Sequence, residues 1–184
     1  MKNLLILLSM FLFSGSLAHA QTTAQDWTKT DCEGNAHTLF NDLDNGKVVL
    51  MQFDMMNCTY CTVAAYNTDQ IFKDFGVSNP GKVLMYSMGY TNTTVCSDMK
   101  NWKSTNGYSF PVIEKCPNEV AYYGGMGMPT IVVAGGKSHK IYYKKLGFNT
   151  SDNAAIKAAI TSALADESAV EGNIPIINKQ RSKN

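Results

Sequence analysis

The chain has 184 residues, with 16 Lys or Arg against 15 Asp or Glu, a formal net charge of +1. Such a balance gives no electrostatic attraction to nucleic acid or to an anionic membrane surface, so we predict neither as a partner. The length supports one domain with a hydrophobic core of its own, rather than a minimal scaffold that depends on its five cysteines for stability.

The first 20 residues, "MKNLLILLSMFLFSGSLAHA", are typical of a secretory signal peptide, with an apolar run over 4–13 and an Ala-x-Ala pattern over 18–20. The run is shorter than the roughly 18 to 20 residues that a transmembrane helix needs. We therefore predict cleavage before Gln21, a periplasmic or secreted protein, and no integral membrane segment after cleavage. In that environment disulfides form and persist.

Four elements are predicted in the first half of the mature chain. Residues 26–40 indicate a β-hairpin, because a Cys-Glu-Gly-Asn turn separates two short polar–apolar alternations. Residues 47–55 are nearly all apolar, which favours a strand buried on both faces. Over 59–75 apolar side chains recur at helical spacing, and Gly76 is expected to end that helix. Residues 82–90 indicate a second core strand.

The next segment predicts a helix over 96–107, with Ser97 as its N-cap and Gly107 as its stop. A short strand is expected over 108–113, and one or two helical turns over 118–125.

The C-terminal part predicts a hairpin formed by 129–136 and 140–148, then an alanine-rich helix over 151–169. The alternation of strands and helices, closed by a hairpin, indicates an α/β sheet covered by helices on both faces. We expect a single domain over 21–170 and a loosely ordered tail over 171–184.

Two cysteines, Cys58 and Cys61, lie where the predicted strand gives way to the predicted helix. The first turn of a helix has unpaired backbone N–H groups and the positive end of the helix dipole, which together stabilise a thiolate. We therefore predict a lowered pKa for Cys58, which makes it the attacking nucleophile. Cys61, one turn further in and better shielded, is suited to resolve the mixed disulfide that Cys58 forms.

Two other interpretations of the pair have less support. A structural zinc site needs four ligands, yet Cys96 and Cys116 are twenty residues apart and the mature chain has only His37 and His139. A purely structural disulfide between residues so close in sequence stabilises a fold little. A redox pair is therefore the prediction, with no metal and no cofactor other than the dithiol itself.

The chain resembles the thioredoxin-like superfamily, and within it the TlpA/ResA-type extracytoplasmic thiol-disulfide oxidoreductases. A hydrophobic strand runs directly into Cys58; "FPVI" at 110–113 resembles the family's Phe/Tyr-Pro-Val strand; "VAYYGGMGMPT" at 120–130 resembles its cis-proline segment. The resemblance implies a thioredoxin fold with a central mixed sheet and an N-terminal hairpin extension. It also implies protein thiols or disulfides as substrates, a further electron-exchange partner, and a monomer.

By the same resemblance Pro129 is expected to be cis and to lie beside the dithiol. The backbone of Met128 is then free to pair with an extended substrate segment, and Thr130 completes the substrate-positioning group. The alternative is a trans proline that simply begins a strand.

The sequence departs from the family at its proton acceptors. Gln52 occupies the position of the buried Asp of thioredoxin, and Ala64 the position where ResA-type proteins often have Glu; Asn57 replaces the usual Trp. Asp54 shares a strand face with Gln52 by period-two alternation, and it is our candidate for deprotonating Cys61. The alternative is a solvated acid at the mouth of the strand.

The remaining cysteines, Cys32, Cys96 and Cys116, allow three pairings. We favour Cys32 with Cys96, since a hairpin turn and a helix start can be joined at low strain. Cys96 with Cys116 is the second choice, and a second redox relay is a further alternative to a structural bridge.

Methionines are frequent in the segments expected near the dithiol, at positions 55, 56, 88, 126 and 128. Thioethers and thiolates bind Cu(I), so a copper chaperone is one alternative function; against it, such chaperones use a Cys-x-x-x-Cys spacing and a distant histidine. Methionines also form adaptable substrate surfaces. A non-catalytic interaction module is the third hypothesis, and the exported oxidoreductase is the one we favour.

Overall fold

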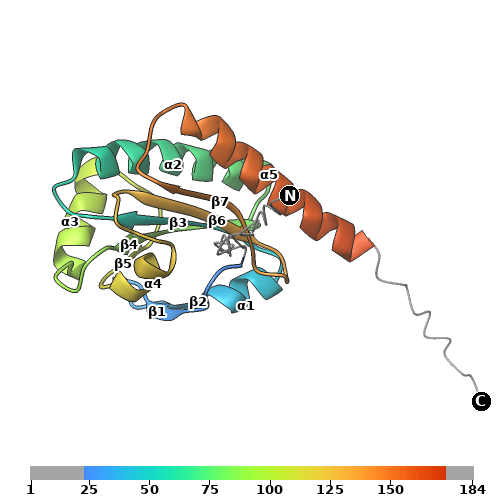
Figure 1. The fold of residues 1–184 in the computed structure, drawn as a ribbon, viewed down its shortest axis with the longest axis horizontal. Coiled ribbons are helices and arrows are strands. Elements are labelled where there is room, and N and C mark those ends of the chain that lie inside the picture. The colour runs from blue at the N-terminus through green and yellow to red at the C-terminus, as the bar shows by residue number, and fades with distance from the viewer. Residues whose placement is uncertain (1–22, 173–184) are drawn as a thin grey trace, which may run out of the picture.

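A five-stranded mixed sheet organises the computed structural model, which describes residues 23–172 (Figure 1). The signal peptide predicted over 1–20 and residues 173–184 of the predicted tail lie outside the described residues. The strand order is β5-β4-β3-β6-β7, with β3, β4 and β5 parallel and with β6 antiparallel to both β3 and β7. The strands are β3 (Val48–Asp54), β4 (Val83–Gly89), β5 (Val112–Ile113), β6 (Thr130–Gly135) and β7 (Lys140–Leu146).

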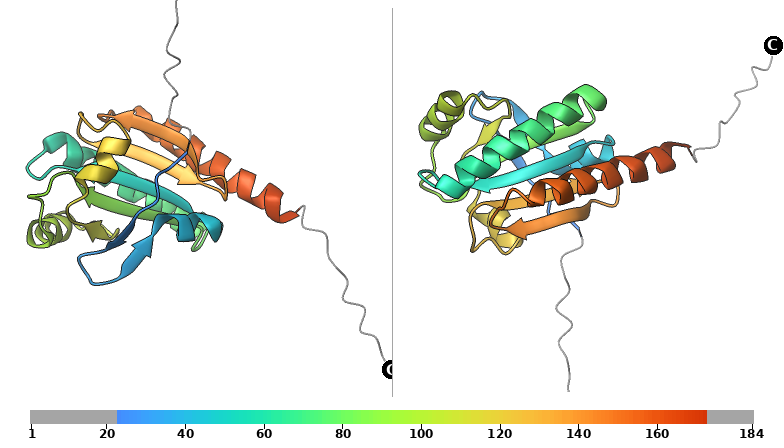
Figure 2. Two further views of the ribbon diagram at one scale, coloured as in Figure 1. Left: turned by 60° about the horizontal axis from the view of Figure 1, so that its bottom comes forward. Right: turned by 90° about the horizontal axis from the view of Figure 1, so that it is seen from above.

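Helices cover both faces of this sheet, as predicted. Helices α2 and α5 lie side by side over one face (Figure 2), and the hairpin β1–β2 lies on the other face with α1 and α4 (Figure 1). Helix α3 packs beside β5 at the sheet's edge. These elements are β1 (Thr28–Thr30), β2 (Ala36–Thr38), α1 (Leu39–Asp44), α2 (Thr59–Ser78), α3 (Cys96–Asn106), α4 (Pro117–Tyr122) and α5 (Asp152–Gly172).

Strand β3 is buried along its whole length because both of its faces are covered. Val48 and Leu50 belong to the core beneath α2 and α5, whereas Val49 and Met51 belong to the core on the α1 and α4 side. The row that begins with Val48 and Leu50 continues with Gln52 and Asp54, which are polar. The alternation of β3 therefore places two polar side chains under the first turns of α2.

Two helix boundaries differ from the prediction. Helix α2 continues through Gly76 to Ser78 and is stopped by Pro80, because the residue before a proline avoids the helical conformation. Ser97 is not the N-cap of α3: Val95 occupies that position without a side-chain bond, and the Glu114 carboxylate accepts the Cys96 N–H at 2.8 Å.

Other elements are shifted or new. Helix α1 was not predicted, β5 is shorter than the expected strand, and α5 extends past 169 to Gly172. Gly107 does end α3, in the left-handed conformation with φ of 70°. Within residues 23–172, no helix combines the length and the hydrophobicity required to cross a bilayer.

Candidate active site

The dithiol lies at the start of α2, directly after the β3 strand. Cys58 is the N-cap of the helix, and its Sγ accepts the backbone N–H of Cys61 at 3.1 Å. The two cysteines form a disulfide with their Cα atoms 5.2 Å apart. Cys58 is half-buried, whereas Cys61 is 1% exposed. Cys58 is therefore the sulfur that a large partner can reach, and a thiolate there can retain the same N–H donor.

The peptide bond between Met128 and Pro129 is cis. Thr130, the next residue, begins β6 and pairs with Phe53 near the end of β3. This register puts Pro129 at the sheet end from which the chain runs into Cys58. Among residues 23–172, none forms a hydrogen bond with the backbone of Met128, which is partly exposed. The edge beside the dithiol thus offers a free backbone N–H and C=O.

A buried carboxyl group lies beneath the start of the helix. Asp54 is 0% exposed, so the alternative of a solvated acid at the mouth of the strand is wrong. Its Oδ1 accepts Gln52 Nε2 at 2.7 Å, and its Oδ2 accepts Ser87 Oγ at 2.6 Å. Burial raises the pKa of Asp54 to about 7, although the hydrogen bonds from Ser87 and Gln52 oppose that rise.

Gln52 connects this carboxyl group to the dithiol turn. Its Nε2 also lies 3.2 Å from the carbonyl oxygen of Cys61, and its Oε1 accepts Thr68 Oγ1 at 2.8 Å. Sequence reasoning did not identify Ser87 or Thr68. For Ser87 a signal was present, because it is a polar residue inside an apolar strand and pairs with Gln52 across β3 and β4.

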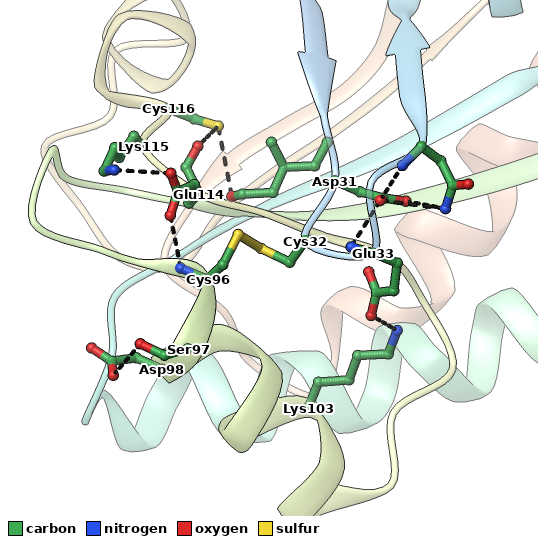
Figure 3. Close-up of a disulfide and its surroundings, with 12 residues drawn as sticks. Asp31, Cys32, Glu33, Cys96, Ser97, Asp98, Lys103, Glu114, Lys115 and Cys116 are labelled. Carbon is green, nitrogen blue, oxygen red and sulfur yellow. Dashed lines mark hydrogen bonds and ion pairs between the residues drawn. A yellow bond between two sulfur atoms is a disulfide. The ribbon is translucent and has the colours of Figure 1, made fainter.

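The second disulfide joins Cys32 to Cys96, the pairing favoured from the sequence (Figure 3). It ties the turn of the N-terminal hairpin to the first residue of α3. Cys116 remains a free thiol, fully buried, so its pairing with Cys96 is wrong. Burial raises the pKa of the Cys116 thiol to about 12, and its Sγ donates to the Glu114 carbonyl at 3.4 Å. That thiol stays protonated at neutral pH.

The methionines near the dithiol do not share one environment. Met126 is 92% exposed and Met55 is 43% exposed, whereas Met88 is buried in the core on the α1 and α4 side. In the part of the chain that the structure describes, no three His, Cys, Asp or Glu side chains gather as a metal site would require.

No protein-family model and no curated protein sequence matches the chain. Solved structures do match. A protein assigned as a thiol:disulfide interchange protein DsbE from Chlorobium tepidum has 20% identity and a TM-score of 0.65, over 78% of this chain and 96% of that one.

Two further solved structures have a similar fold. The exposed lipoprotein thioredoxin Etrx1 of Streptococcus pneumoniae has 24% identity and a TM-score of 0.59, over 75% of this chain and 99% of that one. The thioredoxin domain of a thiol-disulfide oxidoreductase from Bacteroides vulgatus has 22% identity and a TM-score of 0.58, over 78% and 99%. At such identities the likeness shows the fold alone: this chain has a thioredoxin-like fold, with a central mixed sheet and an N-terminal hairpin extension.

Proposed function

We propose that this protein is an exported thiol-disulfide oxidoreductase that exchanges disulfides with partner proteins through Cys58 and Cys61. One observation carries the proposal: a reachable Cys58 at the start of a helix is disulfide-bonded to a buried Cys61, at the sheet end that carries the cis-proline. The solved proteins of like fold support it, since their names include thiol:disulfide interchange protein and thiol-disulfide oxidoreductase.

In the reducing direction the Cys58 thiolate attacks one sulfur of a partner disulfide. A bond forms between Cys58 Sγ and that sulfur, the partner S–S bond breaks, and the other partner sulfur leaves as a thiolate. Cys61 then loses its proton and attacks Cys58 Sγ, which releases the second partner thiolate. Two electrons pass to the partner, and the Cys58–Cys61 disulfide seen in the structure remains. Oxidation of a partner dithiol is the same sequence in reverse.

Asp54 is the proposed proton acceptor for Cys61. A carboxyl group with a pKa of about 7 is close to half ionised at neutral pH, so it can both take up and return a proton. Gln52 supports the assignment, because one amide group bonds to the Asp54 carboxylate and to the Cys61 carbonyl. Asp54 acts here through Cys61, not on the partner.

Partner positioning is assigned to Met128, Pro129 and Thr130. The free backbone of Met128 suits an extended partner segment that adds to the edge as a further strand. Thr130 holds the loop in shape, since its Oγ1 donates to the Gly127 carbonyl at 2.8 Å. Pro129 accepts the Gly147 N–H at 2.7 Å through its carbonyl, which ties the loop to the end of β7.

The decisive experiment is covalent trapping in the exported compartment. A Cys61→Ser variant should accumulate mixed disulfides with partner proteins through Cys58, visible on non-reducing gels and identified by mass spectrometry. A Cys58→Ser variant is the matched control and should trap none. If both variants trap the same partners, the nucleophile is another cysteine and the proposal fails.

The direction of transfer is measured separately, as the reduction potential of the Cys58/Cys61 couple. A value near about −270 mV, that of thioredoxin, indicates a reductase, and a value near about −120 mV indicates an oxidase. Export is tested by the N-terminal sequence of the protein recovered outside the cytoplasm, which should begin at Gln21.

A further inference from the structure

The first turn of α2 is tied to α3 by one side chain, that of Thr62. This threonine follows Cys61, and its Oγ1 accepts the indole N–H of Trp102 at 3.2 Å. The same Oγ1 donates, at the longer distance of 3.4 Å, to the backbone carbonyl oxygen of Cys58. Trp102 belongs to α3, 40 positions further along the chain, so the contact joins two separate helices at the dithiol.

The chemistry of the indole ring fixes the direction of these two hydrogen bonds. An indole nitrogen can only donate, so the Thr62 hydroxyl accepts from Trp102 and keeps its own proton for the Cys58 carbonyl. A hydroxyl that accepts one hydrogen bond donates the next more strongly. The two bonds therefore form a chain in which each proton points towards Cys58, the residue that carries the reachable sulfur.

The Cys58 carbonyl oxygen also accepts the backbone N–H of Thr62, at 3.1 Å. Because Cys58 is the N-cap, this is the first hydrogen bond of the helix. An N–H and an O–H from one residue thus meet at one carbonyl and restrict the rotation of the Cys58 peptide group. With that group fixed, Cys58 Sγ lies where it accepts the N–H of Cys61.

A second donor holds the backbone of Thr62. The hydroxyl of Tyr108, which follows α3, donates to the Thr62 carbonyl oxygen at 3.0 Å. Burial, together with the negative charges of Asp54 and Asp69, raises the pKa of Tyr108 to about 12. The hydroxyl therefore remains a donor at neutral pH. Thr62 is anchored both at its side chain and at its carbonyl group.

Aromatic packing holds the two donors in place. The rings of Trp102 and Tyr108 meet edge to face with their centroids 4.9 Å apart, and Tyr108 stacks on Phe110 with centroids 5.2 Å apart. Tyr108 and Phe110 are buried. Aromatic pairs of this kind favour particular ring arrangements. The positions of the donors are therefore set by the fold and do not depend on the state of the dithiol.

The anchoring of Thr62 matters most after the disulfide has been reduced. In the oxidised protein the S–S bond itself holds Cys58 Sγ beside Cys61. Reduction removes that covalent restraint, and the Cys58 side chain can then rotate away from the Cys61 N–H. A carbonyl that stays bonded to Thr62 keeps Cys58 at the helix start, where the free N–H groups and the helix dipole stabilise a thiolate.

We propose that Thr62, held by Trp102 and Tyr108, is a positioning residue that keeps Cys58 at the start of α2 in the reduced protein. It acts through the Cys58 backbone rather than on the partner. The inference rests on the proposed disulfide exchange and deepens it. By favouring the Cys58 thiolate, Thr62 sets both the rate of attack and the balance between dithiol and disulfide.

The first test measures the ionisation of Cys58, as the pH dependence of its alkylation by iodoacetamide in the mature Cys61→Ser protein. All five cysteines lie within the described residues, and Cys58 is then the one reachable thiol, because Cys116 is buried and the other two are paired. Adding Thr62→Val, which removes the hydroxyl and keeps the side-chain volume, should raise the midpoint by about half a pH unit. Thr62→Ser keeps the hydroxyl and should keep the midpoint of the parent.

The matched control is Thr161→Val, in the middle of α5. The Thr161 hydroxyl also donates to the carbonyl oxygen four residues earlier, that of Lys157, at 3.0 Å. The control should leave the midpoint unchanged. Tyr108→Phe and Trp102→Phe each keep an aromatic ring and remove one donor, so both should raise the midpoint, by less than Thr62→Val does.

The second test uses the complete pair of Cys58 and Cys61 in equilibrium with glutathione. Two glutathione thiols reduce the protein disulfide to the dithiol and leave as one glutathione disulfide, so two electrons enter the protein. Because Thr62→Val makes the thiolate less favourable, the equilibrium constant should shift towards the protein disulfide, by up to about threefold at neutral pH. Thr161→Val should not change it.

An unchanged midpoint in Thr62→Val, or an equal rise in Thr62→Ser and Thr62→Val, would overturn the inference, since the hydroxyl would then play no part. If Thr62→Val does not fold, Tyr108→Phe and Trp102→Phe decide, and unchanged midpoints in both refute the positioning role. The proposed function has its own readout, because Cys58 of the parent should ionise well below about 8.5, the pKa of an ordinary thiol. A parent midpoint near that value would count against the exchange reaction itself, whereas a low one with no effect at Thr62 refutes the positioning role alone.

Discussion

The two disulfides of this protein differ in sequence separation and in their surroundings. Cys58 and Cys61 are three positions apart at the start of a helix, and Tyr60 between them is exposed. Cys32 and Cys96 are 64 positions apart and join the N-terminal hairpin to α3. By loop-closure entropy the long-range bridge stabilises the fold by about 4 kcal/mol, and the short one by about half as much. One bridge therefore suits stability, and the other suits exchange.

The largest expected effect is on the rate of disulfide exchange. Cys58→Ser should abolish disulfide exchange, at least about a thousandfold in rate, because it removes the reachable thiolate at the start of α2 and leaves the buried Cys61 in its place. The rate is measured by reduction of a protein disulfide at neutral pH. Cys116→Ala is the control and should leave the rate unchanged, since that thiol is buried and protonated. Exchange that persists in Cys58→Ser would erase the distinction between the two bridges.

The second effect is on stability. Replacing both Cys32 and Cys96 by alanine should lower the free energy of unfolding by about 3 to 4 kcal/mol, with the exchange rate of Cys58 retained. Urea denaturation of the oxidised protein measures the loss. A folded double variant that no longer exchanges disulfides would make the long-range bridge part of the reaction, as a second relay.

The third effect concerns the resolving step and its pH dependence. Asp54→Asn should slow the attack of Cys61 on a preformed mixed disulfide about 10- to 100-fold. In the wild type this step should accelerate as pH rises through about 7, because the carboxylate form is the base. The variant should lose that inflection. Stopped-flow kinetics across the pH range measure it, and an unchanged profile would exclude Asp54 as the acceptor.

Asp54→Asn should also change the free energy of unfolding. The direction of the change depends on how tightly the folded state binds the Asp54 proton. The folded pKa of Asp54 lies above its ordinary value of 3.8, so the folded state binds the proton more tightly. The stability that comes from the neutral carboxyl is fully present below pH 3.8 and is lost as pH rises through about 7. Asp54→Asn should therefore be more stable than the wild type at pH 8, by about 2 kcal/mol, and the gain should disappear in acid. Denaturation at the two pH values measures this.

The smallest effect concerns the hydrogen bond from Ser87 to the buried carboxyl group of Asp54. Ser87→Ala removes the hydroxyl that donates to Asp54 Oδ2, and this hydrogen bond lowers the pKa of the carboxyl. The variant should move the inflection of the resolving step upward by about one pH unit, with the rate at high pH preserved. A slower plateau with no shift would show that Ser87 acts only through packing.

Much of the site could be predicted from local patterns in the sequence. The buried strand that runs into Cys58, the helix that contains Cys61 and the proline turn at Pro129 all follow from residues close together in the sequence. The hairpin at the N-terminus followed from its turn residues in the same way. Helix α1 was missed because its six residues show too little periodicity, and α2 was ended too early because Gly76 is tolerated in a helix until Pro80 stops it.

What the amino-acid order determined by itself is therefore the local chemistry: two cysteines at a strand–helix junction and a proline able to be cis. The tertiary structure alone decided which cysteine pairs with Cys32, that Ser87 and Gln52 enclose Asp54, and that Trp102 of α3 meets Thr62 at the start of α2. The physical reason is the distance along the chain over which each effect acts. Propensity and periodicity act between neighbours along the chain, whereas burial, pKa shifts and long-range hydrogen bonds arise where distant segments pack together.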